Sequence, residues 1–203
     1  MTQMLRTWTG LRDGPFPVIQ VDGDLGRAQQ EWLHTNGAGA YSMSTVALMH
    51  TRRTHGLLVA ALDPPLDRFV MLSHGETSLE VDGKTYRLST HQFPDIAPTP
   101  GFRFLQSFAQ DPVPRWTYRV GEAEFERTLA LVRGLNAVVL RYRWSGPSPA
   151  LLSLRPLMPF RPIGALMREH GTMVQSVALR PGAGLIVTEL TVLPLASLYR
   201  LLA

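Results

Sequence analysis

The chain contains no cysteine, a single lysine and no long hydrophobic run. The absence of cysteine excludes disulfides, thiolate metal sites and cysteine nucleophiles. The longest clean apolar run, residues 56–62, is far too short to span a bilayer. No apolar segment follows a basic start at the N-terminus, so we expect no secretory signal and a cytoplasmic protein that does not enter a membrane.

Arginine supplies nearly all of the positive charge. Of the 20 basic residues only Lys84 is a lysine, and with 16 acidic residues the formal net charge is +4. The arginines are dispersed along the chain, whereas a nucleic-acid footprint gathers them into a patch. The composition, 45% hydrophobic and 18% charged, is that of a globular protein. The chain is also long enough to bury a core that needs no disulfide or metal ion for stability.

Prolines and glycines divide the chain into short pieces that predict strands. The 16 prolines and 17 glycines disfavour long helices. Asp82-Gly83 separates two of the predicted strands and suits a type I′ hairpin, because both central residues take positive φ. The pieces expected to be strands are residues 44–49, 55–62, 68–73, 76–81, 84–88, 151–157 and 173–179.

The middle of the chain shows clear alternation. Apolar side chains alternate with polar ones over residues 124–131, and with Arg141 and Arg143 over residues 138–144, on either side of a turn at residues 134–136. Many short strands with frequent turns predict an all-β fold, an antiparallel β-sandwich or barrel, in one domain over residues 1–203.

Little helix is expected. A single short helix is predicted at residues 25–33, with Asp22 or Asp24 as its N-cap. The proline-rich residues 93–101 are expected to form an ordered loop or a sheet edge, because proline cannot donate to a β-ladder.

Two neighbouring segments, residues 31–41 and 51–60, hold the densest set of functional residue types. An indole can cover a sugar face, and planar polar groups can bind hydroxyls. The structural alternative is an Asn36-Gly37 turn, a core Trp32, and arginines that pair with carboxylates such as Glu31. The candidate carbohydrate-binding residues are Trp32, Asn36, Arg52, Arg53 and His55.

The same segments carry a family resemblance. Glu-Trp-Leu-x-Thr-Asn-Gly-x-Gly-x-Tyr begins at residue 31, Thr-Arg-Arg-x-His-Gly-Leu-Leu-Val-Ala begins at residue 51, and Pro64-Pro65-x-x-Arg68 follows. Further motifs, among them Pro-x-Trp-x-Tyr from residue 114 and Leu-Arg-Pro-Leu from residue 154, keep the same order. Together they resemble the N-terminal domain of bacterial and archaeal glycogen debranching enzymes, the amylo-α-1,6-glucosidase family, from about residue 15 to about residue 185.

This resemblance implies both a fold and a role. The fold is a large β-sandwich, a galactose-mutarotase-like supersandwich, which precedes an (α/α) barrel. The activity of the whole enzyme is hydrolysis of α-1,6 branch points in glycogen breakdown, with the catalytic acids in the barrel. The chain lacks that barrel, so we expect a non-catalytic domain without cofactor or metal, which docks on the barrel and binds glucan.

Some positions depart from the family pattern. Thr54 stands where tyrosine is usual, Ala40 where glycine is usual, and Pro162 where aspartate is expected. Residues 186–203 form a divergent apolar tail, which suggests a truncated or frameshifted reading frame. Surface that a barrel would cover, together with the tail, predicts a dimer or larger species.

Other functions stay open as alternatives. A stand-alone carbohydrate-binding domain is one alternative. A mutarotase-like domain is another, which would use His55 and Glu76, by fold analogy alone. Nucleic-acid binding would use residues 141–144, but on a strand the arginines and the rings of this segment face opposite ways. Metal binding is disfavoured, because His50 and His55 are five residues apart and no His-Glu-x-x-His occurs.

Overall fold

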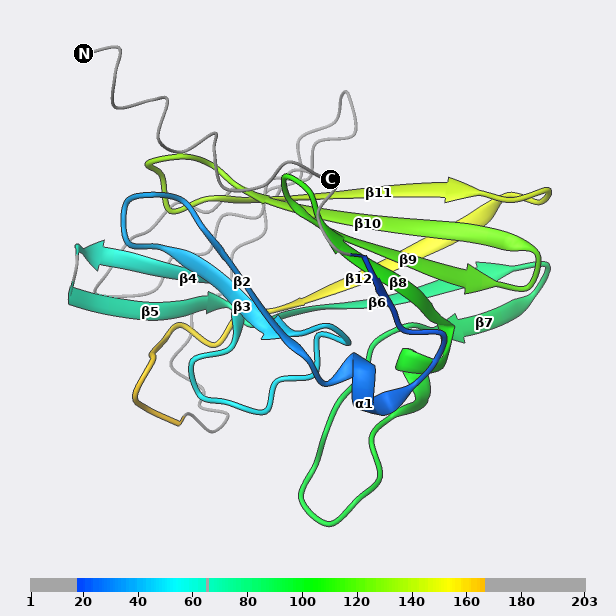
Figure 1. Cartoon of the computed structure of the whole chain (residues 1–203), viewed down its shortest axis with the longest axis horizontal. Helices are drawn as coiled ribbons and strands as arrows, with labels where there is room; N and C mark the ends of the chain where they lie inside the picture. The colour runs from blue at the N-terminus through cyan, green and yellow to red at the C-terminus, as the bar shows by residue number, and fades with distance from the viewer. Residues whose placement is uncertain (1–17, 65, 167–203) are drawn as a thin grey trace.

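A computed structural model describes residues 18–64 and 66–166 of the chain, and these residues form an all-β sandwich (Figure 1). One layer is the antiparallel sheet β1-β8-β9-β10-β11. The facing layer contains two antiparallel sheets, β12-β6-β7 and β13-β5-β4-β3-β2. The predicted fold class is therefore confirmed. The elements are β1 (Ile19–Gln20), α1 (Leu25–Ala28), β2 (Glu31–Thr35), β3 (Tyr41–Thr45), β4 (Gly56–Asp63), β5 (Leu66–Leu72), β6 (His74–Val81), β7 (Lys84–Arg87), the 3₁₀ turn η1 (Pro100–Phe104), β8 (Leu105–Gln110), β9 (Pro114–Val120), β10 (Ala123–Leu131), β11 (Val138–Ser145), β12 (Ala150–Leu157) and β13 (Arg161–Pro162).

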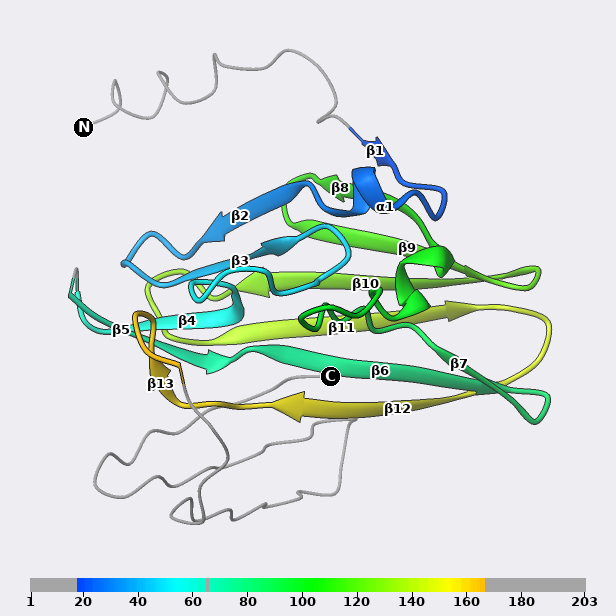
Figure 2. The ribbon, with the colours of Figure 1, turned by 90° about the horizontal axis from the view of Figure 1, so that it is seen from below.

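The two sheets of the second layer follow one another along the chain, as the view from below shows (Figure 2). Strand β5 passes through Ser73 into β6, and β12 leads back to β13 beside β5. Ser73 donates from its backbone N–H and its hydroxyl to the Leu157 carbonyl, at 2.8 and 2.9 Å. These bonds continue the ladder across the junction, so the strand pair runs the whole length of the layer.

Both predicted hairpins are confirmed. Asp82 and Gly83 have φ of +50° and +73° and join β6 to β7, which is the type I′ geometry. Gly134, with φ of +76°, lies in the turn between β10 and β11, where the Val132 N–H donates to the Ala137 carbonyl. The local sequence sets both turns, because positive φ suits glycine.

The predicted helix at residues 25–33 is wrong in its second half. The helix α1 ends at Ala28, and its N-cap is Asp24, whose Oδ1 accepts from the Arg27 N–H at 2.7 Å. Residues 31–35 form β2 and pair with β3. A strand places Trp32 in the core against the facing layer, and this tertiary contact overrides the local helical pattern.

The strand predicted at residues 44–49 is also corrected. Strand β3 begins earlier, at Tyr41, and ends at Thr45. The Thr45 hydroxyl accepts from the Met49 N–H and donates to the Met49 carbonyl, both at 2.9 Å. Leu48 takes a φ of +58°. Residues 46–49 are therefore a tight, fully buried turn, and their apolar side chains enter the core without belonging to a strand. The strand predicted at residues 173–179 lies outside the described residues.

The core contains an aromatic cluster that joins the two layers. The rings of Trp32, Phe108 and Trp116 lie 5.2 to 6.0 Å apart, centroid to centroid. The indole N–H of Trp32 donates to the Thr45 carbonyl at 2.9 Å, and that of Trp116 donates to the Val46 carbonyl at 2.8 Å. The polar atoms of both indoles are satisfied, so burial of the rings leaves no indole N–H group unpaired. In the part of the chain that the structure describes, no helix is long and apolar enough to cross a membrane.

Candidate functional site

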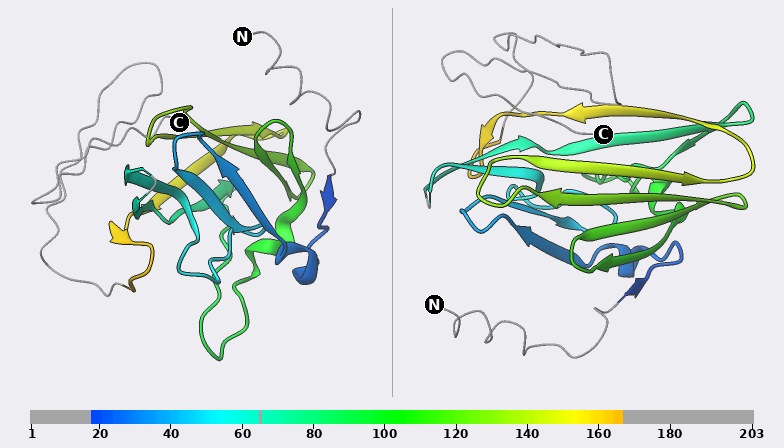
Figure 3. Two further views of the ribbon diagram at one scale, coloured as in Figure 1. Left: turned by 60° about the vertical axis from the view of Figure 1, so that its left-hand side comes forward. Right: turned by 90° about the horizontal axis from the view of Figure 1, so that it is seen from above.

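Three loops gather on one side of the sandwich, outside the second layer and below the strands in Figure 1. They are residues 46–55, residues 88–100 and residues 158–166, and we call this surface the loop end. The Arg161 Nη2 group donates to the Arg53 carbonyl at 2.6 Å, and the Arg53 Nη1 group donates to the Gly164 carbonyl at 3.4 Å. These bonds tie the first loop to the third. Figure 3 shows the second loop projecting beyond the other two.

A row of four imidazole rings joins the first loop to the second. The ring centroids of His55 and His50 are 5.8 Å apart, those of His50 and His74 are 5.6 Å apart, and those of His74 and His91 are 5.0 Å apart. His74 is the first residue of β6, and the other three lie on the loops. We call this set the histidine row.

A glutamate contacts each end of the histidine row. Glu31 Oε1 lies 3.3 Å from His55 Nε2, and Glu76 Oε1 lies 3.2 Å from His91 Nε2. Each glutamate also forms an ion pair with an arginine, Glu31 with Arg52 and Glu76 with Arg155. The expected pairing of Glu31 with Arg52 or Arg53 is thus confirmed for Arg52.

Burial keeps the middle of the row uncharged. Desolvation lowers the pKa of His50 to about 3, and the neighbouring His55 adds to that effect. Desolvation also lowers the pKa of His74 well below its ordinary value, with His50 and Arg127 adding to it. The pKa of His55 is lowered as well, because burial outweighs the attraction of Glu31. These rings are therefore neutral imidazoles at neutral pH.

The row does not converge on one point. Within the described residues, no group of three or more His, Cys, Asp or Glu side chains is arranged to hold a metal ion. Several ring nitrogens of the row, His50 Nε2 and both nitrogens of His74, lack a hydrogen-bond partner in the described structure. The row is thus a set of largely buried polar side chains that connects two loops.

Trp32 and Asn36, two of the five residues predicted to bind carbohydrate, hold the fold together. Trp32 is 5% exposed and packs against Phe108 and Trp116, so its ring has no open face for a sugar. Asn36 is buried; its side-chain oxygen accepts from the N–H groups of Ala38 and Ala40, and its Nδ2 donates to the Leu135 carbonyl. Both therefore take the structural role that the sequence left open as an alternative.

Arg52, Arg53 and His55, the other three predicted residues, come together at the loop end. Arg52 and Arg53 are exposed, and Arg52 Nε donates to Glu31 Oε1 at 2.5 Å. The hydrogen bond from Arg52 is the largest of the effects that lower the pKa of Glu31. His55 is buried beneath them, where its Nδ1 accepts from the Thr51 N–H at 3.2 Å. Only the two arginines present free polar groups to solvent.

Three residues of the histidine row were missed by the sequence reasoning as site members. His50 had been considered only for its spacing from His55, and His74 and His91 carried no signal of their own. His74 and His91 meet because residues 88–100 fold back over the start of β6, and this contact cannot be read from spacing along the chain. Glu76, suggested as a partner of His55, contacts His91 instead.

The outer face of the β12-β6-β7 sheet carries a cleft of about 670 Å³. We call it the sheet cleft. It opens between the sheet and residues 88–100, and the cross-strand pair of Glu76 and Arg155 lies in it. The residues that line it are mainly charged or hydroxyl-bearing: Glu76, Thr77, Ser78, Arg87, Ser89, His91, Thr99, Ser153 and Arg155, with Pro100 and Leu154.

The carboxylates near the histidine row are poorly arranged for glycoside hydrolysis. That reaction uses two carboxyl groups about 5 to 10 Å apart, and one of them needs a raised pKa to act as the acid. Glu31 and Glu76 lie at opposite ends of four imidazole rings, and the pKa of Glu31 is lowered rather than raised. Each glutamate instead forms an ion pair with an arginine and a contact with a histidine.

A family model described as "Glycogen debranching enzyme N terminal" matches residues 30–192. The match takes in every strand from β2 to β13, and with them the loop end, the histidine row and the sheet cleft. The match ends at residue 192, and so extends beyond residue 185, the approximate end of the resemblance predicted from the sequence motifs. No curated protein and no solved structure matches the chain.

Proposed function

The chain belongs to the family of glycogen debranching enzyme N-terminal domains, and on that premise we propose that it is a non-catalytic module which holds a catalytic domain through its loop end. The whole assembly acts on branched α-glucan. We propose further that this assembly takes part in glycogen breakdown and is located in the cytoplasm. The catalytic acids belong to the partner domain, as the family resemblance implies.

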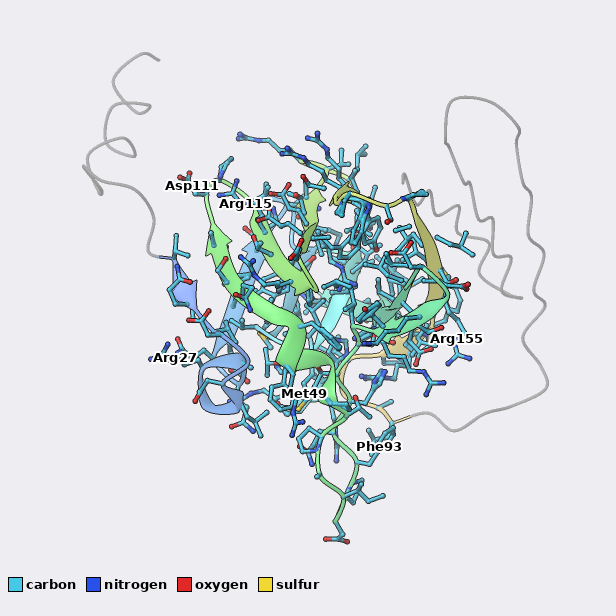
Figure 4. All side chains as sticks on the ribbon, turned by 90° about the vertical axis from the view of Figure 1, so that its right-hand side faces the viewer. Arg27, Met49, Phe93, Asp111, Arg115 and Arg155 are labelled. Atoms are coloured by element: carbon cyan, nitrogen blue, oxygen red, sulfur yellow. The ribbon has the colours of Figure 1, made fainter. Side chains whose placement is uncertain are left out.

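One observation supports docking above all, namely the apolar tip of the second loop. Phe93 is 50% exposed and Ile96 is 63% exposed, although the loop that carries them is ordered by hydrogen bonds. The His91 N–H donates to Thr99 Oγ1 at 2.8 Å, and Gln92 Nε2 donates to the Ile96 carbonyl at 3.0 Å. Figure 4 shows Phe93 on this projecting loop, below the body of the sandwich. Apolar side chains held out in this way are typical of an interaction surface.

Charged groups lie on the neighbouring loop of the same surface. Arg52 and Arg53 are exposed on the neighbouring loop, and Arg161 joins that loop to residues 158–166. An apolar centre with a polar rim is the usual anatomy of a protein interface. Of the five candidate residues, Arg52 and Arg53 are the ones we propose for direct contact with the catalytic domain or with glucan at its rim. Trp32, Asn36 and His55 support the loops behind them.

A binding experiment tests docking. The catalytic domain of a debranching enzyme, produced separately, is titrated with this chain by calorimetry. The double change Phe93→Ser and Ile96→Ser should weaken binding at least tenfold, because burying one large apolar side chain contributes about 1.5–3 kcal/mol. Leu135→Ser is the matched control, since Leu135 is an exposed apolar residue on the turn between β10 and β11, away from the loop end. Equal affinity of both variants and the unchanged chain would exclude docking through this loop.

The same surface predicts the behaviour of the chain alone. We propose that Phe93 and Ile96 drive self-association to a dimer or larger species when no catalytic domain covers them. Light scattering at micromolar concentration should show the larger species for the unchanged chain, and a shift toward monomer for the double variant. A clean monomer of the unchanged chain contradicts this. The apolar tail at residues 190–199, expected to contribute, lies outside the described residues.

A further inference from the structure

The sheet cleft has features of a ligand site that the docking role does not use. Its volume of about 670 Å³ falls within the range of small-molecule sites. It lies beside the base of the projecting loop, on the outer face of β12, β6 and β7. None of the five residues predicted from the sequence lines it.

We propose that the sheet cleft binds a segment of α-glucan through the hydroxyl groups of the sugar. The choice of glucan among polyhydroxyl ligands rests on the proposed function, whereas the position of the site rests on the cleft itself. The proposal concerns binding alone and includes no chemical step.

The floor of the cleft is a regular set of polar side chains. Ser78 on β6 is paired directly with Arg87 on β7 and with Ser153 on β12. In the next outward-facing position, Glu76 is paired with Arg155. Side chains two residues apart on a strand point to the same face, so these five groups share one surface. Two hydroxyls, two guanidinium donors and one carboxylate acceptor therefore lie together, and each can bond a sugar hydroxyl.

The central carboxylate is held in place from two sides. Arg155 Nε donates to Glu76 Oε2 at 2.5 Å, and His91 Nε2 lies 3.2 Å from Glu76 Oε1. A carboxylate fixed in this way keeps free lone pairs for hydroxyl donors, and the guanidinium groups keep N–H groups for hydroxyl acceptors. Preorganisation of this kind lowers the entropic cost of binding.

The charge of the cleft suits a neutral ligand. Glu76 carries one negative charge, which Arg155 balances, and Arg87 adds one positive charge. Pro100 contributes apolar surface beside the polar groups, against which the C–H face of a sugar ring can pack. The cleft therefore has one unpaired positive charge, which is too few for binding a polyanion, because such a ligand needs several cations.

The test is a calorimetric titration of the full chain with maltoheptaose. Arg155→Ala should weaken binding about tenfold, since a hydrogen bond to a charged group contributes roughly one factor of ten. Ser153→Trp should abolish binding, because Ser153 is exposed on the floor and a bulky ring there fills the cleft without entering the core. Arg115→Ala is the matched control; Figure 4 shows Arg115 and Arg155 on opposite sides of the molecule. Unfolding curves of all variants confirm that they fold.

The outcomes separate this site from the loop end. Loss of affinity in Arg155→Ala and Ser153→Trp, with Arg115→Ala unchanged, supports the cleft. Undiminished affinity in those two variants, with loss in a double Arg52→Ala and Arg53→Ala variant, moves the glucan to the loop end; it overturns the cleft and leaves the proposed function standing. No saturable binding by the unchanged chain overturns the saccharide site, while docking is judged by its own titration.

Discussion

At the scale of single residues, Arg127 is a charged side chain buried in the core, whereas most arginines are solvated. It is 2% exposed and lies on the core face of β10, between Phe125 and Leu129. Its guanidinium carbon is 5.9 Å from the ring centroid of Tyr118 and 5.6 Å from that of Tyr142, and its Nη2 donates to the Thr77 hydroxyl. No carboxylate pairs with it within the described residues. Aromatic faces and one hydroxyl thus offset part of its desolvation.

Trp32 gives the sharpest prediction at this scale, because two roles had been proposed for it. Trp32→Ala should lower the free energy of unfolding by about 3–5 kcal/mol, the usual cost of emptying an aromatic core position. Leu33→Ala is the control, since Leu33 is 51% exposed on the opposite face of the same strand, and its change should stay near 0.5 kcal/mol. Urea unfolding measures both. Equal, small losses would mean that the Trp32 ring does not hold the core.

At the scale of elements, the projecting loop depends on how its two ends are packed. Gly101, at the start of η1, lies against the backbone of the residues that begin the loop. A Cβ at this position would lie 2.3 Å from the Ser89 carbonyl oxygen and 2.5 Å from the Leu88 carbonyl oxygen. Backbone atoms cannot move aside as a flexible side chain can. The close approach therefore fixes where the loop leaves and rejoins the sandwich.

We accordingly expect Gly101→Ala to destabilise the protein by about 1–3 kcal/mol, the range for overpacking. This corresponds to a fall of several degrees in the melting temperature for a domain of this size. Gly164→Ala is the control, because nothing lies within 4 Å of an added Cβ there. Thermal unfolding followed by circular dichroism compares the two variants. A melting temperature unchanged by Gly101→Ala would mean that the base of the loop adjusts freely.

At the scale of the whole molecule, the histidine row links segments that are far apart in the sequence. It begins beside β2, passes the turn before β4 and the start of β6, and ends beside the projecting loop. Two of its rings are deeply buried and uncharged. Arg127 lies near His74 and adds a positive charge to the surroundings of the row. A proton added there would meet both burial and like charge.

The row therefore predicts that acid destabilises the fold. The pKa values of His50 and His74 are lower in the folded than in the unfolded state, so below pH 6.5 the unfolded chain binds more protons. Stability should fall as the pH decreases below about 6.5, by roughly 1.4 kcal/mol per pH unit for His50 down to about pH 3, and His74 adds to the fall in the same direction. Urea unfolding at pH 7.5, 6, 5 and 4 measures the slope, and a His50→Leu variant should show a shallower one. Constant stability between pH 7 and pH 5 would contradict a neutral, buried row.

The sequence by itself determined the fold class, the hairpins and the family. Alternation along β10 and β11 and the positive φ of Asp82-Gly83 are properties of neighbouring residues, so they can be read without a structure. Even here, alternation indicates which face of the strand a residue lies on and not its chemistry, so it does not show how Arg127 is accommodated on the core face of β10. The family motifs are likewise local strings in a fixed order.

Only the tertiary structure decided which side chains meet. Residues 31–35 became a strand because β3 was available to pair with them and the facing layer could bury Trp32. The pairing of β6 with β12 brought Glu76 to Arg155, 79 residues away in the chain, and so formed the sheet cleft. Contacts between distant residues depend on sheet order and on how the loops fold back, and neither leaves a periodic signal in the sequence. The sheet cleft is for that reason a feature that local sequence patterns do not show.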